Sequence, residues 1–370
     1  MNRSILRRAA LPAALALSFG LAACSGSNEA TTGSGSDESS TSSSLSGSLN
    51  GAGASTQTVA QQTWAAGFQG TNPDVQLNYD PVGSGGGREQ FLSGAVPFAG
   101  SDAFLDDEEL AQAQERCVGG NAMDLPTYVS PIAIAFNLPG VETLNLSPAT
   151  VASIFTGTIT TWNDPAIVAE NAGVTLPATA ITPVHRSDDS GTTENFTEYL
   201  HAAAPDVWTA EADGAWPLTG GEAAQGTSGV VQALQGGEGT IGYADESQIA
   251  PTELGTVSVK VGEAYVGPTA EAAAAVVDAS TEVEGRPEGD IAIELDRTTT
   301  AAGAYPVVLV SYSIVCSAYE DAAQGELVKA YMEYVISEEG QNAAAEAAGS
   351  APISEDLRTQ ITASLDRIGA

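Results

Sequence analysis

The sequence predicts an α/β fold with mostly parallel sheets, and three observations lead to this prediction. First, 43% of the 370 residues are hydrophobic, which is enough for a sizeable core, and the length suits two ordinary domains. Second, short apolar runs alternate with segments of helical periodicity. Third, the chain shows no internal repeat of a solenoid or propeller. The runs with strand character are 128–140, 240–247 and 304–316, and those with helical character are 149–157 and 326–349.

Residues 1–23 have the pattern of a secretory signal peptide. The basic segment "MNRSILRR" precedes an apolar run that is too short and too broken to predict a membrane span. The following "LAAC" resembles a bacterial lipobox, in which Cys24 is diacylated and becomes the first residue of the mature protein. An ordinary signal peptidase site at a similar place is the alternative.

Residues 24–46 are predicted to form a flexible tether. Glycine and serine dominate this segment, which holds too little apolar surface to bury. A lipidated end followed by such a tether would hold the folded part near a membrane, on its extracytoplasmic face.

Cys117 and Cys316 are the cysteines that remain once Cys24 is assigned to lipidation. In an oxidising compartment an even pair predicts a disulfide. A reactive or metal-binding thiol is the alternative, but neither cysteine has a histidine or a second cysteine close by in sequence. The disulfide would bring the end of the chain back to the domain in which it starts.

The formal net charge is −35 at pH 7. A surface this acidic argues against nucleic acid or an anionic membrane surface as a partner held by charge. It favours a soluble monomer.

Three turns rich in glycine and hydroxyl residues each lead into a helical pattern. Glycine lets the backbone approach a ligand, and the unpaired N–H groups at a helix start favour an anion. The third turn also lies close to a lone guanidinium, Arg186. Helix capping explains each turn alone, but three together favour an oxyanion site. The hydroxyl and glycine residues concerned are Ser55, Thr56, Ser84, Ser190, Gly191 and Thr192.

A carboxylate occupies a fourth position of this kind. Asp102 follows a Gly-Ser pair and precedes a helix rich in acidic residues. Helix capping is again the simple explanation. A buried carboxylate would repel a bound anion, unless that anion carries a proton to donate.

The residues predict a binding protein rather than an enzyme, with no cofactor and no metal ion. Ser190 lies near His185, but the chain lacks a G-x-S-x-G motif and has two histidines in all. It also lacks H-E-x-x-H and closely spaced cysteines, and "GSGGGRE" lacks the Lys-Ser/Thr that ends a P-loop.

Seven motifs resemble, in order and spacing, those of the PstS-type phosphate-binding proteins of ABC importers. The resemblance spans about residues 48–355 and is most specific in "HRSDDSGTTENFTEYL" and "YDPVGSGGGREQFLSG". The other motifs are "GAGAST", "FAGSDAFL", "SIFTGTITTWNDPAI", "GTIGYADES" and "APIS". The resemblance implies a two-lobed periplasmic-binding-protein type II fold, with a hinge of two chain crossings, that closes on orthophosphate.

The resemblance also implies the ligand-binding residues. These are Ser55, Thr56, Ser84, Asp102, Arg186, Ser190, Gly191 and Thr192. For Thr56 the implied contact is the backbone N–H, because relatives often have an aromatic side chain there. Asp188 would pair with Arg186 and hold its guanidinium in place. Asp102 would accept the P–OH hydrogen bond of hydrogen phosphate, which sulfate does not carry.

Four further residues of the "HRSDDSGTTENF" motif are predicted to lie outside the ligand set. They are His185, Asp189, Glu194 and Asn195, expected as wall, helix-start or surface residues.

We therefore predict a monomeric, lipid-anchored phosphate receptor that delivers its ligand to the permease of an ABC transporter. Lobe one is expected at 47–130 and 308–370, and lobe two at 131–307, with crossings near 129–133 and 306–310. Three alternatives remain open. They are a receptor for another tetrahedral oxyanion such as sulfate or molybdate, a secreted phosphatase of low turnover, and a tethered adhesion module.

Overall fold

The computed structural model describes residues 45–369. The predicted signal peptide at 1–23, the lipidation site Cys24 and nearly all of the predicted tether lie outside the described residues. Within 45–369, no helix is both long enough and apolar enough to cross a membrane.

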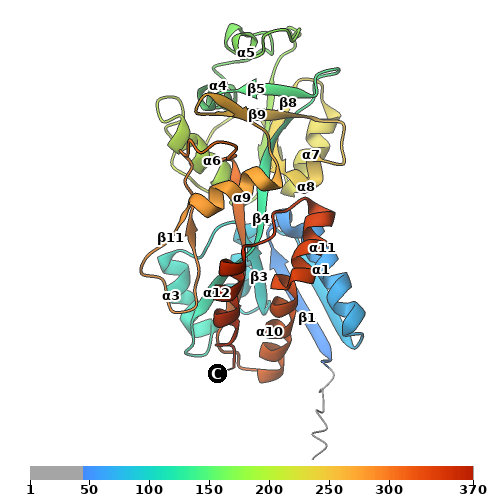
Figure 1. The fold of residues 1–370 in the computed structure, drawn as a ribbon, viewed down its shortest axis with the longest axis vertical. Coiled ribbons are helices and arrows are strands. Elements are labelled where there is room, and N and C mark those ends of the chain that lie inside the picture. Colours follow the sequence, from blue (N-terminus) through green and yellow to red (C-terminus); the bar gives the residue numbers. More distant parts are fainter. Residues whose placement is uncertain (1–44, 370) are drawn as a thin grey trace, which may run out of the picture. The chain divides into compact units, whose positions relative to one another are not determined.

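The chain forms a mixed sheet of eleven strands that runs through the whole described fold (Figure 1). The main path of the sheet is β2-β1-β3-β13-β4-β8-β6-β7, and β9 joins it through β4 and carries β5 and β10. The strands are β1 (Gly47–Gly53), β2 (Val75–Asp80), β3 (Phe98–Ser101), β4 (Ala122–Phe136), β5 (Thr143–Leu146), β6 (Thr182–Arg186), β7 (Glu222–Ala224), β8 (Thr240–Asp245), β9 (Gly255–Val261), β10 (Ala264–Val266) and β13 (Val308–Cys316). A separate pair is formed by β11 (Thr281–Glu282) and β12 (Ile293–Glu294).

Helices cover the sheet in two groups. The β1 half, which contains β1 to β3, carries η1 (Ser55–Gln57), α1 (Thr58–Thr71), α2 (Ser84–Leu92), α3 (Asp107–Arg116), α10 (Ala322–Ile336), α11 (Glu338–Ala348) and α12 (Glu355–Leu365). The β8 half, which contains β5 to β10, carries α4 (Pro148–Phe155), α5 (Pro165–Glu170), α6 (Gly191–Ala203), α7 (Gly226–Gly236) and α8 (Glu246–Ile249), and α9 (Ala270–Ala279) packs on β4 and β13. The predicted α/β class is confirmed.

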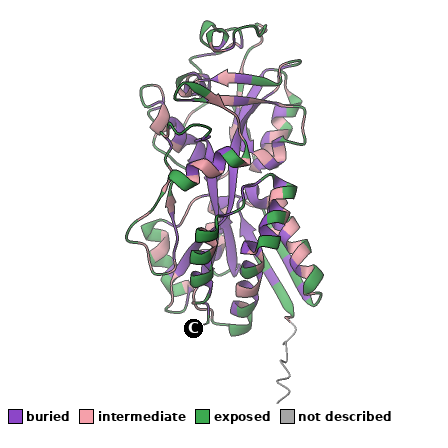
Figure 2. Cartoon of the chain, viewed as in Figure 1, coloured by how far each residue is buried: buried purple, intermediate pink, exposed green. Residues whose placement is uncertain are grey.

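β4 and β13 are the strands that connect the two halves. They pair antiparallel with one another, and β4 continues from this pairing into antiparallel pairing with β8. Every residue of both strands is buried, so they form the purple centre of Figure 2.

The expectation of mostly parallel sheets is wrong, because parallel pairs such as β1–β2 and β6–β8 are joined through these antiparallel strands. A strand that is buried on both faces reads as a continuous apolar run, which is also the pattern of a parallel strand.

The glycine-rich residues just before Ser55, predicted as part of a turn, are instead the end of strand β1. Its residues "GSLNGAG" pair parallel with both β2 and β3. Its glycines are required by packing, since a Cβ on Gly51 would lie 2.1 Å from the ring of Phe98.

The helix expected at 326–349 is two helices, α10 and α11. Ser337 ends the first and caps the second, where its Oγ accepts a hydrogen bond of 3.0 Å from the N–H of Gly340. A serine at a helix start satisfies an otherwise unpaired N–H group, which explains the break inside a continuous apolar pattern.

The predicted disulfide between Cys117 and Cys316 is present. Both cysteines are fully buried, and the bond joins the end of α3 to the end of β13. The end of the chain therefore returns to the β1 half, as expected.

Candidate functional site

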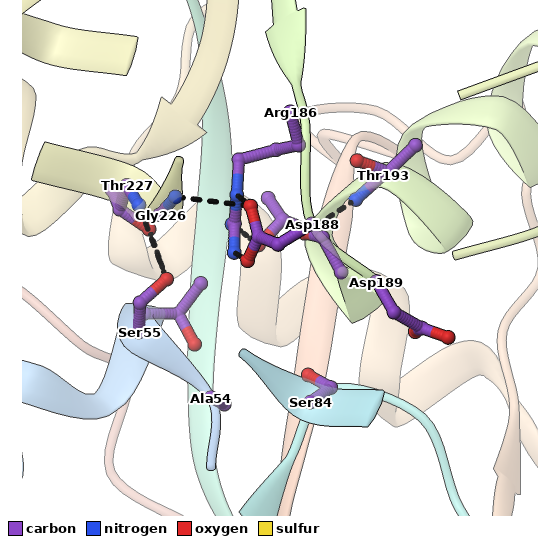
Figure 3. A network of polar contacts seen from close by, with 12 residues as sticks. Ala54, Ser55, Ser84, Arg186, Asp188, Asp189, Thr193, Gly226 and Thr227 are labelled. Atoms are coloured by element: carbon purple, nitrogen blue, oxygen red, sulfur yellow. Dashed lines mark hydrogen bonds and ion pairs between the residues drawn. The ribbon is translucent and has the colours of Figure 1, made fainter. Parts of the chain in front are cut away.

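Four helix starts from distant parts of the chain meet between the two halves of the fold (Figure 3). η1 and α2 come from the β1 half, and α6 and α7 come from the β8 half. Hydrogen bonds join the two halves here. The Oγ of Ser55 accepts from the N–H of Thr227 at 3.1 Å, and the Oγ1 of Thr192 donates to Asp102 at 3.1 Å. The structure thus brings the predicted residues of both halves into one buried place.

Asp102 lies at the centre of this place and is 3% exposed. Its Oδ1 accepts hydrogen bonds of 2.6 Å from both Thr56 and Ser311, and its Oδ2 accepts from Thr192. An ionised carboxylate has about four lone-pair positions, so three hydroxyl donors leave room for one more donor.

Burial raises the pKa of Asp102, and the hydrogen bonds from Ser311, Thr56 and Thr192 and the charge of Arg186 act in the opposite direction. The carboxylate is therefore held among donors with little access to solvent, where the loss of one hydrogen bond has a large energetic effect.

Ser311 reaches Asp102 because β13 pairs antiparallel with β3. Tyr312 lies opposite Ser101, so the next residue on each side, Ser311 and Asp102, come side by side. On its other edge β13 shifts register against β4 at Ser311/Tyr312, where Thr127 of β4 is the extra residue. The hydroxyl of Ser311 also accepts from the Nε2 of Gln57 at 2.7 Å, so it is held from two sides. Sequence reasoning missed Ser311, because the pairing that brings it to Asp102 joins strands 209 residues apart.

Arg186 is the cation of the site and is 2% exposed. Its guanidinium forms a bidentate ion pair with Asp188, in which Nε donates to Oδ1 at 2.8 Å and Nη2 donates to Oδ2. The Oδ1 of Asp188 also accepts from the N–H of Gly226 at 3.0 Å. Burial opposes ionisation of Asp188, but these contacts prevail and lower its pKa. The Nη1 of Arg186 faces Thr192 Oγ1 at 3.4 Å.

The start of α6 is tightly packed against the β1 half. A Cβ on Gly191 would lie 2.7 Å from the Cβ of Asp102 and 2.7 Å from the Oγ of Ser84, so only glycine fits. Ser190 accepts from the N–H of Thr193 at 3.2 Å, which is ordinary helix capping by its side chain. The ligand role of the Ser190 hydroxyl remains a prediction.

The start of α2 presents its backbone to the same place. Its N-cap is Gly83, which has no side chain with which to cap the helix. The N–H groups of the first turn, beginning with that of Ser84, therefore have no side-chain partner at the N-cap. The Oγ of Ser84 accepts from the N–H of Asp102 at 3.0 Å. Ser84 is 1% exposed.

Asn195 was expected among wall, helix-start and surface residues, and it instead reaches across the site. It is 6% exposed, and its Nδ2 donates to the backbone oxygen of Asp102 at 2.7 Å. Its spacing of four from both Gly191 and the buried Tyr199 places it on the inner face of α6, which is the signal that could have identified it. Asp189 does lie at the surface, with a side chain 57% exposed.

Thr227 and Gln248 were also not predicted. Thr227 bonds to Ser55 through both its N–H and its hydroxyl, the latter at 2.9 Å. The Nε2 of Gln248 donates to the backbone oxygen of Ser55 at 3.1 Å. Both residues lie in helices of the β8 half, α7 and α8, that are far from "GAGAST" in sequence.

The described part of the chain contains no group of three or more His, Cys, Asp or Glu side chains placed to hold a metal ion.

Comparison with known proteins gives consistent matches over most of the chain. A family model described as a PBP superfamily domain matches residues 38–339. The phosphate-binding protein PstS2 of Mycobacterium bovis (strain BCG / Pasteur 1173P2) is 36% identical over 355 residues, which cover 94% of this chain and 95% of the relative. The phosphate-binding protein PstS 3 of Mycobacterium leprae (strain TN) is 35% identical over 356 residues, with the same two shares.

Solved structures share the fold at lower identity. A high-affinity periplasmic phosphate-binding protein, PfluDING, bound with phosphate, has a TM-score of 0.69 at 23% identity and covers 86% of this chain and 93% of its own. A putative phosphate ABC transporter substrate-binding protein from Clostridium perfringens, solved with bound phosphate, has a TM-score of 0.60 at 18% identity and covers 83% of this chain and 100% of its own. These likenesses confirm the two-lobed periplasmic-binding-protein fold.

Proposed function

Because the chain belongs to the PBP superfamily and, within it, to the PstS phosphate-binding proteins, we propose that it binds inorganic phosphate outside the cytoplasmic membrane. It would deliver the phosphate to the permease of an ABC transporter. Its relatives are named as phosphate-binding proteins, which supports this role. The arrangement of donors around Asp102 supports phosphate as the ligand.

The observation that carries the proposal is a buried carboxylate surrounded by donors. A site for a fully deprotonated oxyanion gains nothing from Asp102, because the two negative charges repel each other. Hydrogen phosphate keeps one P–OH near neutral pH and can donate it to the acceptor position that Thr56, Ser311 and Thr192 leave open. Sites built around a required hydrogen bond reject analogues that lack it by about 10⁴- to 10⁵-fold.

The remaining phosphate oxygens would be bound by donors rather than by a large positive charge. Asp188 neutralises much of the charge of Arg186, so the guanidinium acts mainly through its directed N–H groups. Each hydrogen bond to a charged group contributes about 1.5–3 kcal/mol. The proposed ligand set is Ser55, Thr56, Ser84, Asp102, Arg186, Ser190, Gly191 and Thr192.

The proposed lobes are 47–130 with 308–370 and 131–307, and β4 and β13 would form the hinge between them. The pairing of Val129 with Val310 and of Pro131 with Val308 supports a hinge at these crossings. One segment of the proposed second lobe rests on the first, since Arg286 pairs with the buried Asp124 at 2.6 Å.

We propose no catalytic activity for this site. The hydroxyl of Ser190 accepts a helix N–H, and both ring nitrogens of His185 face backbone oxygens, of Arg186 at 2.9 Å and Gly220 at 3.2 Å. Neither group is placed as a nucleophile and base pair. The proposal also includes a signal peptide at 1–23, lipidation of Cys24, and action as a membrane-anchored monomer.

Calorimetric titration of the purified chain from Ser25 to Ala370 tests the proposal. Phosphate and arsenate, which both keep a proton near neutral pH, should bind, and sulfate and molybdate should not. Tight binding of sulfate, or turnover of a chromogenic phosphate ester that an Arg186→Ala variant loses, would contradict it.

A further inference from the structure

Two amide side chains bridge the two halves of the fold at residues of the candidate site. Asn195 donates to the backbone oxygen of Asp102 at 2.7 Å, and Gln248 donates to the backbone oxygen of Ser55 at 3.1 Å. In both pairs the amide belongs to the β8 half and the carbonyl to the β1 half. Both carbonyls belong to residues of the proposed ligand set, so the amides hold the backbone of that set rather than its side chains.

The amide of Asn195 has one orientation that satisfies all its groups. Its Nδ2 donates to the oxygens of Asp102 and, at 2.8 Å, Gly191, while its Oδ1 accepts from the Nη2 of Arg297. A rotated amide would place its oxygen against two carbonyl oxygens and its nitrogen against a guanidinium, which only donates. The bridge to Asp102 is therefore directed by the site around it.

Arg297 ties this bridge to the second chain crossing. Its side chain is 3% exposed, its Nη1 donates to the backbone oxygens of Pro306 at 3.1 Å and Val308 at 2.5 Å, and its Nε donates to Glu198 at 3.0 Å. Pro306 and Val308 lead into and begin β13. Asn195 is thus held against the strand that connects the halves.

Gln248 stands in a similar relation to the first crossing. It lies in α8, which directly follows β8, and Asp245 at the end of β8 pairs with Ile132 of β4. Each bridging amide is therefore linked to one of the two crossing strands and donates to a carbonyl of the opposite half.

We propose that Asn195 and Gln248 form a two-point latch that holds the lobes closed over bound phosphate and sets the rate of its release. The inference rests on the proposed function, because a latch matters only if the lobes open to free a ligand. When the lobes part, both amides lose their carbonyl partners and bind water instead, so each bond favours the closed state by the net strength of one hydrogen bond. That strength corresponds to about a 5-fold change in rate for each residue.

Stopped-flow measurement of phosphate release from the chain Ser25–Ala370 tests the latch. Asn195→Asp keeps the size of the side chain and its partner Arg297 but removes the donor to Asp102, and Gln248→Ala removes the other bridge. Asn342→Asp makes the same chemical change at an exposed position of α11 and is the matched control.

The latch predicts that each variant releases phosphate about 5-fold faster and the double variant about 25-fold faster, since the two amides share no hydrogen-bond partner and their effects should add. The association rate and the melting temperature of the ligand-free protein should stay near those of the control, which a purely structural role would not give. Should Asn195→Asp fail to fold, Gln248→Ala alone decides.

Two failures are distinguishable. A wild-type chain that does not bind phosphate overturns the proposed function and the latch with it. A wild-type chain that binds phosphate while its variants release at the control rate overturns the latch alone.

Discussion

Replacing Asp102 by asparagine should weaken phosphate binding and admit sulfate. The substitution conserves shape and changes the carboxylate, which accepts three hydroxyl hydrogen bonds, into an amide with one accepting oxygen. Thr56, Ser311 and Thr192 donate through hydroxyl groups, which can also accept, so they can adapt to an amide. Because burial raises the pKa of Asp102, loss of its charge should not destabilise the fold.

The size of the loss in phosphate affinity follows from the one carboxylate acceptor that Asp102→Asn removes. A hydrogen bond to a charged group contributes about 1.5–3 kcal/mol, so the affinity for phosphate should fall about 10- to 150-fold. Sulfate no longer meets a carboxylate and should become measurable as a ligand. The preference for phosphate over sulfate should therefore narrow by about 100-fold or more.

Isothermal calorimetry with each anion measures both changes. Asp74→Asn, which removes the same charge at an exposed turn before β2, is the control. The reasoning is refuted if Asp102→Asn excludes sulfate as strongly as the control does.

Three other changes test the remaining geometry. Gly191→Ala should lower phosphate affinity more than 10-fold, because its Cβ would lie 2.7 Å from that of Asp102 and force the lobes apart; an unchanged dissociation constant would show that the turns are not in contact. Replacing Cys117 and Cys316 together by serine should cost about 2–5 kcal/mol of unfolding free energy in thermal melts and leave phosphate affinity unchanged. Burial and acidic neighbours raise the pKa of Glu194 to about 7, well above its value of about 4.3 in an unfolded chain. Since the folded state then holds the proton more tightly, the free energy of unfolding should fall as the pH rises between these values, and Glu194→Gln should flatten that slope in melts at several pH values.

The class of the fold and the glycine-rich turns could be predicted because their signals are local. In the strand Val75–Asp80, buried and exposed residues alternate. The composition of the turns that contain Ser84 and Ser190 is enough to predict that a helix begins there. The antiparallel direction of β4 and β13 could not be predicted, because full burial on both faces removes the alternation that distinguishes such strands.

The parts of the site that sequence reasoning missed depend on contacts between distant segments. Ser311 faces Asp102 from 209 residues away, and Gln248 faces Ser55 from 193 residues away. Asn195 sits inside the most specific motif, yet its role depends on Arg297, which lies 102 residues further on. Residues of these types are common at surfaces, so the polar character of each was no guide to its burial.

The pairing of β13 with β3 beside Asp102 has a mechanical consequence. Because Ser311 belongs to a strand that connects the two halves of the fold, any torsion of that strand also turns the hydroxyl that donates to Asp102, the proposed acceptor of the ligand's proton. Opening would then perturb the proton-accepting geometry directly, without relay through a loop. Gating of the cavity and discrimination between anions would thus be two outcomes of a single rotation.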